Sequence, residues 1–384
     1  MTTHARRGAK GDGLPLCAVL LAGGRGTRFW PRSRMHTPKQ LLNIVGRETM
    51  LRKTMARLSP LIKPRDIWAV TNAEQVAGVR RELRGVPDSQ ILTEPVGRNT
   101  AAAIGLAAIH LMYEHGDALM AVLPADSYVA DARRYRALLR AALDLARISG
   151  NLAVLGVPPS RSETGYGYIE RGGTAGRPRG ATAYAVKRFT EKPQLSLARR
   201  YVASGKYFWN AGMFFWRVST FLENLRQFLP ATHDALIRLG RTIGTARYAS
   251  TLRQIYPRLE NVSVDYAIME PATRRLGKNT FAHKATRVFV IPAKVGWSDI
   301  GSWAAVYELL APKAGANVFT RRSFALDASG NYFWSPKKFI AAIGVRNLVL
   351  VETEDALLLC SRDRSQDVSK IVRWLEEKRL SLLF

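Results

Sequence analysis

The sequence predicts an α/β protein whose larger part is a Rossmann-like, mostly parallel mixed sheet flanked by helices. Short apolar runs alternate with stretches of helical periodicity as far as residue 160, and this alternation is typical of βαβ units. The apolar runs lack a polar face, as strands covered by helices on both sides require. From about residue 315, short apolar runs separated by turn residues predict a small β-rich C-terminal domain.

The expected elements follow one another in a regular order at first. Strands are expected at 16–21, 66–71, 90–93, 118–123 and 152–157, with helices at 48–58, 73–83, 100–115 and 132–148. After residue 160 the pattern is less regular, with strands at 183–189 and 287–291 and helices at 195–204, 219–229 and 301–310. We expect this middle third to close over a ligand.

The last part of the chain has its own pattern. Strands are expected at 339–343, 348–351 and 356–360, followed by an amphipathic helix with Val368, Ile371, Val372 and Leu375 on one face. The predicted organisation is therefore a disordered basic tail (1–14), a catalytic domain (15–312) and a C-terminal domain (313–384).

Cysteine usage and hydropathy indicate the compartment. The only two cysteines, Cys17 and Cys360, lie in apolar runs and are expected to be buried, reduced strand residues. The longest nearly apolar run, 101–113, contains His110 and is too short to span a bilayer, so it is interpreted as a buried helix. The N-terminus does not have the pattern of a signal peptide, and we expect a cytoplasmic protein with no membrane partner.

The formal net charge is +28 over 384 residues, which raises the hypothesis of a nucleic-acid partner. The basic residues are spread over the whole chain, and the sequence shows no RNP, zinc-finger or basic-zipper pattern. A surface that serves anionic substrates is therefore the favoured interpretation, and nucleic-acid binding is the weaker one.

A glycine-rich segment directly after the first strand carries the strongest chemical signal. Its glycines let backbone N–H groups approach a phosphate chain, Arg28 adds a forked donor, and Lys39 adds a second cation. The spacing is neither that of a dinucleotide-binding loop, because Phe29 stands at the third glycine position, nor that of a Walker A loop. The candidate nucleotide-binding residues here are Leu21, Ala22, Gly23, Gly24, Gly26, Thr27 and Arg28.

Two short runs in this region carry a resemblance to a known family. Gly23-Gly24-x-Gly26-Thr27-Arg28-x-Trp30-Pro31, followed by Pro38-Lys39-Gln40, resembles the signature of bacterial mannose-1-phosphate guanylyltransferases. The Gly-Thr-Arg core resembles the wider sugar nucleotidyltransferase family, and the resemblance extends over 16–377. Some members carry an additional isomerase half; this chain ends without one, and no isomerase activity is expected.

The run Glu94-Pro95-Val96-Gly97-Arg98-Asn99-Thr100 follows an expected strand and precedes a helix. One interpretation is local, with Asn99 or Thr100 as the N-cap of that helix. The resemblance implies instead that this loop lies over the nucleotide base, with Glu94, Gly97, Arg98 and Asn99 as candidate base contacts.

Two aspartates far apart in the sequence are candidate metal ligands. Asp126 ends the run Leu123-Pro124-Ala125-Asp126 at the carboxyl end of a strand, where open α/β sheets bind ligands. Asp299 lies in the run 296–303, and either aspartate could instead form a turn or cap a helix. The resemblance implies that both bind Mg²⁺, a hard cation that prefers oxygen ligands. Many relatives have His where this chain has Ser127, so local hydrogen bonding there is expected to differ.

Three further runs, in the family's order, are candidates for the sugar side. A glycine-flexed strand is expected at 165–169, and an acceptor and a cation stand together at Glu191-Lys192, although such a pair is often only a solvated surface feature. Asn210 offers an amide able to bond two hydroxyl groups. By the resemblance, the candidate sugar-phosphate residues are Gly165, Gly167, Glu191, Lys192 and Asn210.

The resemblance implies nucleotidyl transfer from GTP to α-D-mannose 1-phosphate, giving GDP-mannose, a polysaccharide precursor, and pyrophosphate. Arg28, Lys39 and Lys192 would be the catalytic cations and Mg²⁺ the cofactor. Two alternatives stay open: another hexose-1-phosphate nucleotidyltransferase that uses UTP or dTTP, and a non-catalytic regulatory or nucleic-acid-binding homologue. By analogy, the C-terminal domain could form a homodimer.

Overall fold

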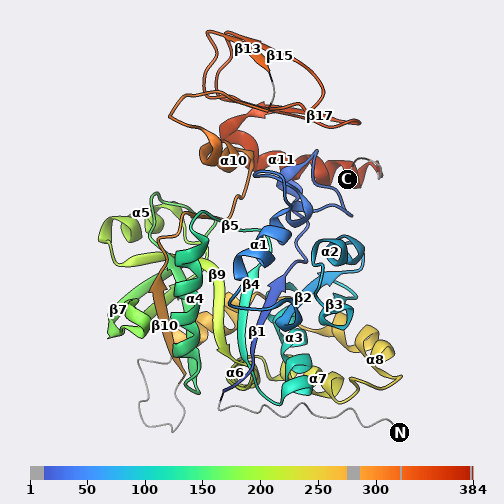
Figure 1. The fold of residues 1–384 in the computed structure, drawn as a ribbon, viewed down its shortest axis with the longest axis vertical. Helices are drawn as coiled ribbons and strands as arrows, with labels where there is room; N and C mark the ends of the chain where they lie inside the picture. The colour runs from blue at the N-terminus through green and yellow to red at the C-terminus, as the bar shows by residue number, and fades with distance from the viewer. Residues whose placement is uncertain (1–12, 275–285, 321, 381–382, 384) are drawn as a thin grey trace.

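A nine-stranded sheet crosses the larger part of the molecule in the order β3-β2-β1-β4-β9-β6-β10-β8-β7 (Figure 1). The structure is a computed structural model and describes residues 13–274, 286–320, 322–380 and 383. The strands are β1 (Leu16–Leu21), β2 (Ile67–Asn72), β3 (Ile91–Glu94), β4 (Leu119–Pro124), β6 (Asn151–Val157), β7 (Tyr168–Gly176), β8 (Ala183–Thr190), β9 (Tyr207–Arg217) and β10 (Arg287–Pro292).

The strand directions confirm the predicted mixed, mostly parallel sheet. β3, β2, β1 and β4 pair in parallel, and β6 pairs in parallel with β10. β9 is antiparallel to β4, β6 and β7, and β8 is antiparallel to β10 and β7. All strands of this sheet except β8 and β9 therefore run in one direction, and their carboxyl ends meet at one edge.

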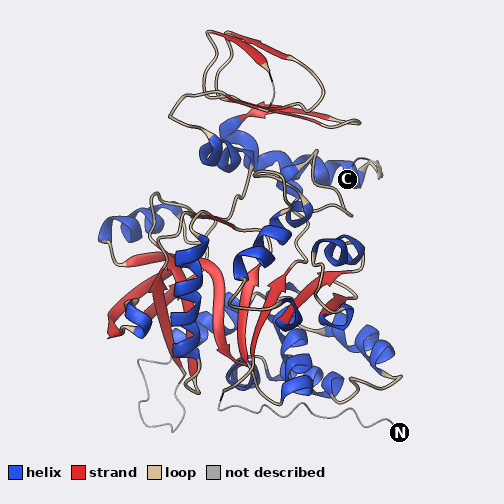
Figure 2. Ribbon diagram, in the orientation of Figure 1, coloured by secondary structure: helices blue, strands red, loops and turns tan. Residues whose placement is uncertain are grey.

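Helices cover both faces of the sheet, as the doubly apolar strands require (Figure 2). In β1, Cys17 and Val19 join the core beneath α3, α6 and α7, whereas Ala18 and Leu20 join the core beneath α1, α2 and α4. The helices of this part are α1 (Met50–Leu58), α2 (Val76–Glu82), α3 (Asn99–His115), α4 (Ala132–Ala146), α5 (Leu195–Ser204), α6 (Val218–Phe228), α7 (Pro230–Gly240), α8 (Tyr248–Ile255), α9 (Glu270–Arg274) and α10 (Trp303–Leu310).

The small β-rich part lies above the sheet domain in Figure 1, next to α10 and α11 (Val368–Glu377). β12 (Val318–Phe319), β14 (Tyr332–Trp334) and β16 (Leu348–Glu352) pair in parallel, and β17 (Leu357–Ser361) closes this sheet antiparallel to β16. β13 (Ser323–Leu326) pairs in parallel with β15 (Ile340–Ile343). The predicted β-rich C-terminal part with a final helix is confirmed.

A third hydrophobic core joins the two parts. Phe29 and Trp30, directly after the glycine-rich loop, pack there with α10 and with residues of the β-rich part. The Trp303 ring stands edge-on to Phe29 at a centroid distance of 5.1 Å and stacks on Tyr332 at 5.6 Å. Burial of an aromatic side chain of this size stabilises by about 1.5–3 kcal/mol. The loop after β1 is thus anchored to the C-terminal part.

Some expectations about individual elements were wrong or incomplete. The strand expected at 165–169 begins only at Tyr168, because the Gly165–Gly167 segment is loop. Cys17 is buried as expected, but Cys360 is only half-buried, although it lies on the same face of β17 as the buried Leu358. Strand β9 and helices α7 and α8 were not expected; glycine and asparagine in β9 hide its alternation. The predicted tail lies almost wholly in residues 1–12, outside the described residues.

The apolar run 101–113 forms the buried helix α3, as predicted. His110 is buried within this helix, and its Nε2 lies 2.7 Å from the Tyr248 hydroxyl oxygen. Within the part of the chain that the structure describes, no helix is long and apolar enough to span a bilayer.

Candidate active site

A cavity of about 370 Å³ opens at the edge of the sheet where the carboxyl ends of β1 and β4 meet. Such edges are where open α/β sheets bind ligands. Ten of the residues singled out in the sequence line it: Gly24, Gly26, Arg28, Lys39, Asp126, Gly165, Gly167, Glu191, Asn210 and Asp299. The structure therefore brings the glycine-rich loop, both aspartates and most of the sugar-side candidates to one place.

The glycine-rich loop is packed closely against the segment that carries Lys39. Gly26 has a φ of 62°, and a Cβ placed there would lie 2.7 Å from the backbone nitrogen of Lys39. Only glycine fits this conformation and this contact. The buried amide of Gln40 donates to the carbonyl oxygens of Ala22 at 2.8 Å and Gly24 at 3.0 Å. Gln40 thus fixes the loop shape while Lys39 extends into the cavity.

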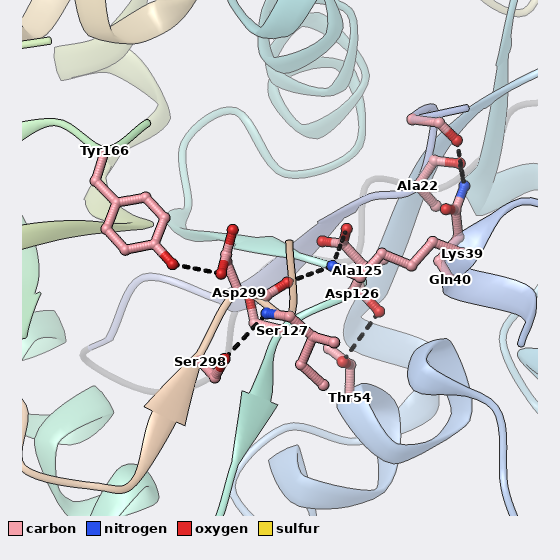
Figure 3. A network of polar contacts seen from close by, with 12 residues as sticks. Ala22, Lys39, Gln40, Thr54, Ala125, Asp126, Ser127, Tyr166, Ser298 and Asp299 are labelled. Atoms are coloured by element: carbon pink, nitrogen blue, oxygen red, sulfur yellow. Dashed lines mark hydrogen bonds and ion pairs between the residues drawn. The ribbon is translucent and has the colours of Figure 1, made fainter. Parts of the chain in front are cut away.

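Lys39 is the central cation of the cavity. Its side chain is only 7% exposed, and its Nζ donates to Asp126 Oδ2 at 2.9 Å. The same Nζ also donates to the backbone carbonyl of Asp299. Figure 3 shows the ammonium group reaching between the two aspartates. A positive charge is thereby held at a fixed point where little solvent screens it.

A short pair of strands explains why the two aspartates meet. β5 (Tyr128–Val129) and β11 (Trp297–Ser298) pair antiparallel, with Ser298 opposite Tyr128. Asp126 precedes β5 and Asp299 follows β11, so both lie at the same end of this ladder. The sequence contains no signal for a two-residue pairing, and the convergence of these carboxylates could not be derived from it.

The carboxylate of Asp299 is oriented by Tyr166, whose hydroxyl donates to Oδ1 at 2.5 Å (Figure 3). Burial and the negative charge of Asp299 raise the pKa of Tyr166, so the phenol stays protonated and remains a donor. Helix capping, the alternative for Asp299, is not what the structure shows. α10 begins only at Trp303, and the amide of Ala304 donates to Ser365 Oγ.

On the opposite side of the cavity, Glu191, Asn210 and Asp265 form a polar cluster. Asn210 Nδ2 donates a hydrogen bond to Asp265 Oδ1 at 2.7 Å. Burial and the nearby charge of Glu191 raise the pKa of Asp265 to about 6. Glu191 Oε2 is shielded from solvent and has no hydrogen-bond partner among the described residues. An acceptor in this state suits the hydroxyl groups of a ligand.

Gly167 allows the approach of Glu191, because a Cβ on this glycine would lie 2.3 Å from Glu191 Oε2. Lys192 does not line the cavity. Its Nζ donates to Glu191 Oε1 at 2.5 Å, and its side chain is 57% exposed, which places it at the rim. Burial lowers the pKa of Lys192, but the hydrogen bond and charge of Glu191 outweigh this and raise it, so the amine is cationic at neutral pH.

The predicted base loop joins β3 to α3, next to the glycine-rich loop. Glu94 is buried and receives a hydrogen bond from Tyr256 at 2.6 Å, and its Oε2 would lie 3.1 Å from a Cβ on Gly23. Burial raises the pKa of Glu94, although hydrogen bonds from Tyr256 and from the backbone of Arg98 oppose this. Glu94 is therefore placed beside the candidate nucleotide loop.

The rest of this loop does not line the main cavity. The guanidinium of Arg98 donates to the carbonyl of Pro257, and Gly97 has open space around it. α3 begins at Asn99 itself, whose φ is 61° and whose Oδ1 accepts from the amide of Thr100 at 2.9 Å. The N-cap of α3 is Arg98, which makes no side-chain capping bond, and Thr100 Oγ1 accepts from the amide of Val264. The local interpretation, with Asn99 or Thr100 as the N-cap, is therefore wrong.

Three residues that contact the candidate site residues carry no local sequence signal. Tyr166 lies in the glycine-flexed segment 165–169, but the partner of its hydroxyl group, Asp299, is 133 positions away. Asp265 begins a π-helical turn (Asp265–Met269), which no simple periodicity predicts. Gln366 accepts a hydrogen bond from Arg28 Nη1 at 2.8 Å across 338 positions. Each of these contacts is created by the tertiary fold, so only co-variation or a structure could identify it.

A glycine loop on the first strand, two clustered cations and two facing carboxylates at this sheet edge define the protein as a nucleotidyltransferase. Residues 17–314 match the nucleotidyl transferase family. Residues 321–375 match the MannoseP isomerase/GMP-like beta-helix domain. The chain belongs to the mannose-1-phosphate guanylyltransferase family.

Several relatives support this membership. The chain is 38% identical to a mannose-1-phosphate guanylyltransferase of Escherichia coli, over 95% of this chain and 74% of that protein. It is 37% identical to the enzyme of the same name from Klebsiella pneumoniae, over 95% of this chain and 75% of that protein. It is 38% identical to the xanthan biosynthesis protein XanB of Xanthomonas campestris pv. campestris strain B100, over 92% and 72%.

A solved structure shares the whole architecture. The crystal structure described as a mannose-1-phosphate geranyltransferase from Thermus thermophilus has a TM-score of 0.82 and is 34% identical, covering 94% of this chain and 100% of that one. The predicted fold class is therefore confirmed for both parts of the molecule.

Proposed function

We propose that the protein transfers the guanylyl group of GTP to α-D-mannose 1-phosphate, giving GDP-mannose and pyrophosphate. The observation that carries this proposal is that Arg28, Lys39, Glu191 and Asn210 line one and the same cavity. One side suits a phosphate chain and the other suits a hexose. Relatives named mannose-1-phosphate guanylyltransferase, 36–38% identical over most of the chain, support the choice of nucleotide and sugar.

In this mechanism, a phosphate oxygen of the sugar phosphate attacks the α-phosphorus of GTP in line. One P–O bond forms, the bond between the α- and β-phosphates breaks, and pyrophosphate leaves with that electron pair. The nucleophile is already anionic at neutral pH, since the second pKa of a phosphate monoester is about 6. No general base is required, and catalysis consists mainly of positioning and charge neutralisation.

The residues divide this work between them. Gly23, Gly24, Gly26 and Thr27 would bind the triphosphate with backbone N–H groups, supported beneath by Leu21 and Ala22. Arg28 and Lys39 would neutralise the charge that develops on the leaving pyrophosphate. Lys192 at the rim would exchange its contact with Glu191 for the phosphate of the sugar. Gly165 and Gly167 would leave space for the hexose, whose hydroxyls would bond Glu191 and Asn210.

For the base, the best-placed acceptor is Glu94, because its carboxylate lies beside Gly23. Guanine presents N–H donors on one edge, and a buried carboxylate that can accept from them discriminates strongly against bases without those donors. Gly97, Arg98 and Asn99 would line the outer side of the base. For its guanidinium to contact the base, Arg98 would have to break its hydrogen bond to the carbonyl of Pro257.

Asp126 and Asp299 fit a magnesium ion. Both are oxygen donors in one cavity, and within the described residues one oxygen of each carboxylate has no hydrogen-bond partner. Among the described residues, no cluster of three or more His, Cys, Asp or Glu could hold a metal, so the remaining ligands would be substrate phosphates and water. Bound there, the ion would supply charge neutralisation to the phosphates.

A pyrophosphate-release assay tests the function. GTP, ATP, UTP and dTTP are each combined with mannose 1-phosphate or glucose 1-phosphate in the presence of Mg²⁺. We expect release with GTP and mannose 1-phosphate, and its loss when the metal is chelated. Release with UTP or dTTP and glucose 1-phosphate instead would keep the site and correct the substrates. No release with any pair from folded protein that binds nucleotide would overturn the proposal in favour of a regulatory homologue.

We further propose that the catalytic domain spans 15–312 and the C-terminal domain 313–384, and that the second forms a homodimer. The family matches to 17–314 and 321–375 support the division. Large apolar side chains are exposed on β13 (Phe324 and Leu326), on β15 (Ile343) and directly before β15, where Phe339 is 67% exposed. Exposed apolar groups gathered on one sheet favour association.

The cytoplasm, where GTP is available and Cys17 and Cys360 stay reduced, is the proposed compartment.

Sedimentation of a Phe339→Glu variant tests this association. We expect the parent to sediment as a dimer at micromolar concentration and the variant to sediment mainly as a monomer, because a charge would be buried at the interface. Ile148→Glu, at a similarly exposed apolar position on the catalytic domain, should leave the dimer intact. A monomeric parent, or a dimer that Phe339→Glu does not weaken, would contradict the proposal.

A further inference from the structure

We propose that the C-terminal domain contributes a positioning residue to the active site, Gln366, which holds the guanidinium of Arg28 without neutralising it. Gln366 lies in the 3-10 segment Arg362–Asp367, between β17 and α11. Its Oε1 accepts a hydrogen bond from Arg28 Nη1 at 2.8 Å. The inference rests on the proposed role of Arg28 in binding phosphate.

The position of Arg28 makes such a contact important. Arg28 lines the active-site cavity and also a second cavity of about 400 Å³ at the junction of the two domains. The two cavities share Gly165, Tyr166, Asp299 and Gly301, so Arg28 stands where they adjoin. An arginine side chain that is not held would sample many rotamers, and ordering it on substrate binding would cost free energy. Gln366 restricts it beforehand.

A comparison of the two arginines in the loop shows the value of a neutral partner. Arg25 is paired with Glu376 of α11, whose carboxylate neutralises its charge. Arg28 is held by an amide oxygen, which satisfies one N–H group and leaves the positive charge available to phosphate oxygens. The C-terminal domain therefore fixes one arginine structurally and holds the other ready for a ligand.

Neighbouring hydrogen bonds fix the position of the Gln366 segment relative to the glycine-rich loop. Trp30 Nε1 donates to the carbonyl of Leu383 at 2.7 Å, and the amide of Ala304 donates to Ser365 Oγ at 3.3 Å. Ser365, next to Gln366, is buried. These bonds flank the contact between Arg28 and Gln366 and belong to the core that joins the domains. Trp30 of the loop motif thus contacts the C-terminal domain and does not line the active-site cavity.

Steady-state kinetics of two substitutions test this role in the full chain. Gln366→Leu removes the acceptor at nearly constant size, and we expect kcat to fall about tenfold with the KM for mannose 1-phosphate unchanged. Gln366→Glu keeps the acceptor but neutralises Arg28, so we expect mainly a higher KM for GTP. A residue with a merely structural role would not separate the two parameters in this way. Lys370→Gln is the matched control, because Lys370 lies in the adjacent helix α11, pairs with Asp367 and lines neither cavity.

A double-mutant cycle with Arg28→Met, which removes both the charge and the donor, completes the test. If Gln366 acts through Arg28, Gln366→Leu has no further effect on kcat in the Arg28→Met background. Additive losses, or a folded Gln366→Leu protein with the kcat of the parent, would overturn the inference. Parent-like kinetics of Arg28→Met itself would instead overturn the proposed role of Arg28, so the two failures are distinguishable. Thermal unfolding of each variant shows whether the protein is folded.

Discussion

Replacing Lys39 by methionine is expected to lower kcat by about 10²–10³-fold while the protein remains folded. Methionine has nearly the same length but no charge, so the packing against Gly26 is kept. The lost ammonium group links the Asp126 carboxylate to the carbonyl of Asp299 and would otherwise face the transferring phosphates. Without it, two carboxylates share the cavity with one cation fewer, and the transition state loses a fixed positive charge.

The measurement is steady-state pyrophosphate release together with thermal unfolding. Lys53→Met is the matched control, because Lys53 donates to the carbonyl of Val45 and does not line the cavity. We expect the control to keep the activity of the parent. A folded Lys39→Met protein with unchanged kcat would remove Lys39 from the catalytic residues. A loss of kcat with a collapse of the unfolding temperature in both variants would point to folding instead.

The elements predicted most accurately are those whose sequence pattern is local. Strand 16–21 was placed at its observed bounds, and α5 was as well, because an unbroken apolar run or a clean helical period defines each of them. β9 was missed although it lies at the centre of the sheet. Its segment Trp209–Phe214 contains Asn210 and a glycine at φ 67°, which interrupt the alternation that a strand normally shows.

In the candidate site, too, the features with a local sequence pattern could be predicted and those without one could not. The glycine-rich loop and Lys39 are close in sequence, and their chemistry could be inferred from residue types alone. That Asp126 meets Asp299 depends on the two-residue ladder between β5 and β11, which is too short to leave a pattern. Asp265 reaches Asn210 from a π-helical turn, and Gln366 reaches Arg28 from another domain. Contacts of this kind depend on the completed fold, whereas motifs depend only on the local chain.

The structure also gives a different meaning to part of the motif that suggested the family. Gly26 and Arg28 face the cavity, but Trp30 packs in the core between the domains and donates to Leu383. Gln40 does not face the cavity either; its amide fixes the backbone of the glycine-rich loop from beneath. A motif can thus combine residues that contact the ligand with residues that hold those residues in place, and the sequence alone does not separate them.

The second large effect is expected for Asp299→Asn, which should lower kcat about a hundredfold at ordinary Mg²⁺ concentration. Asparagine keeps an acceptor for the hydroxyl of Tyr166, so the local geometry is preserved while one negative charge at the proposed metal site is lost. If this carboxylate binds Mg²⁺, the concentration of metal needed for half-maximal activity rises, and excess Mg²⁺ restores part of the rate. Asp126→Asn should behave in the same way.

The matched control for this prediction is Asp144→Asn, because Asp144 forms an exposed pair with Arg179 at 2.7 Å and lies outside the cavity. Surface pairs of this kind contribute about 0–1 kcal/mol, so its activity and metal dependence should equal those of the parent. An Asp299→Asn protein that is slower but has an unchanged Mg²⁺ requirement would show that Asp299 orders Tyr166 and Lys39 rather than the metal. The metal titration, and not the loss of rate alone, therefore decides between a ligand and a structural carboxylate.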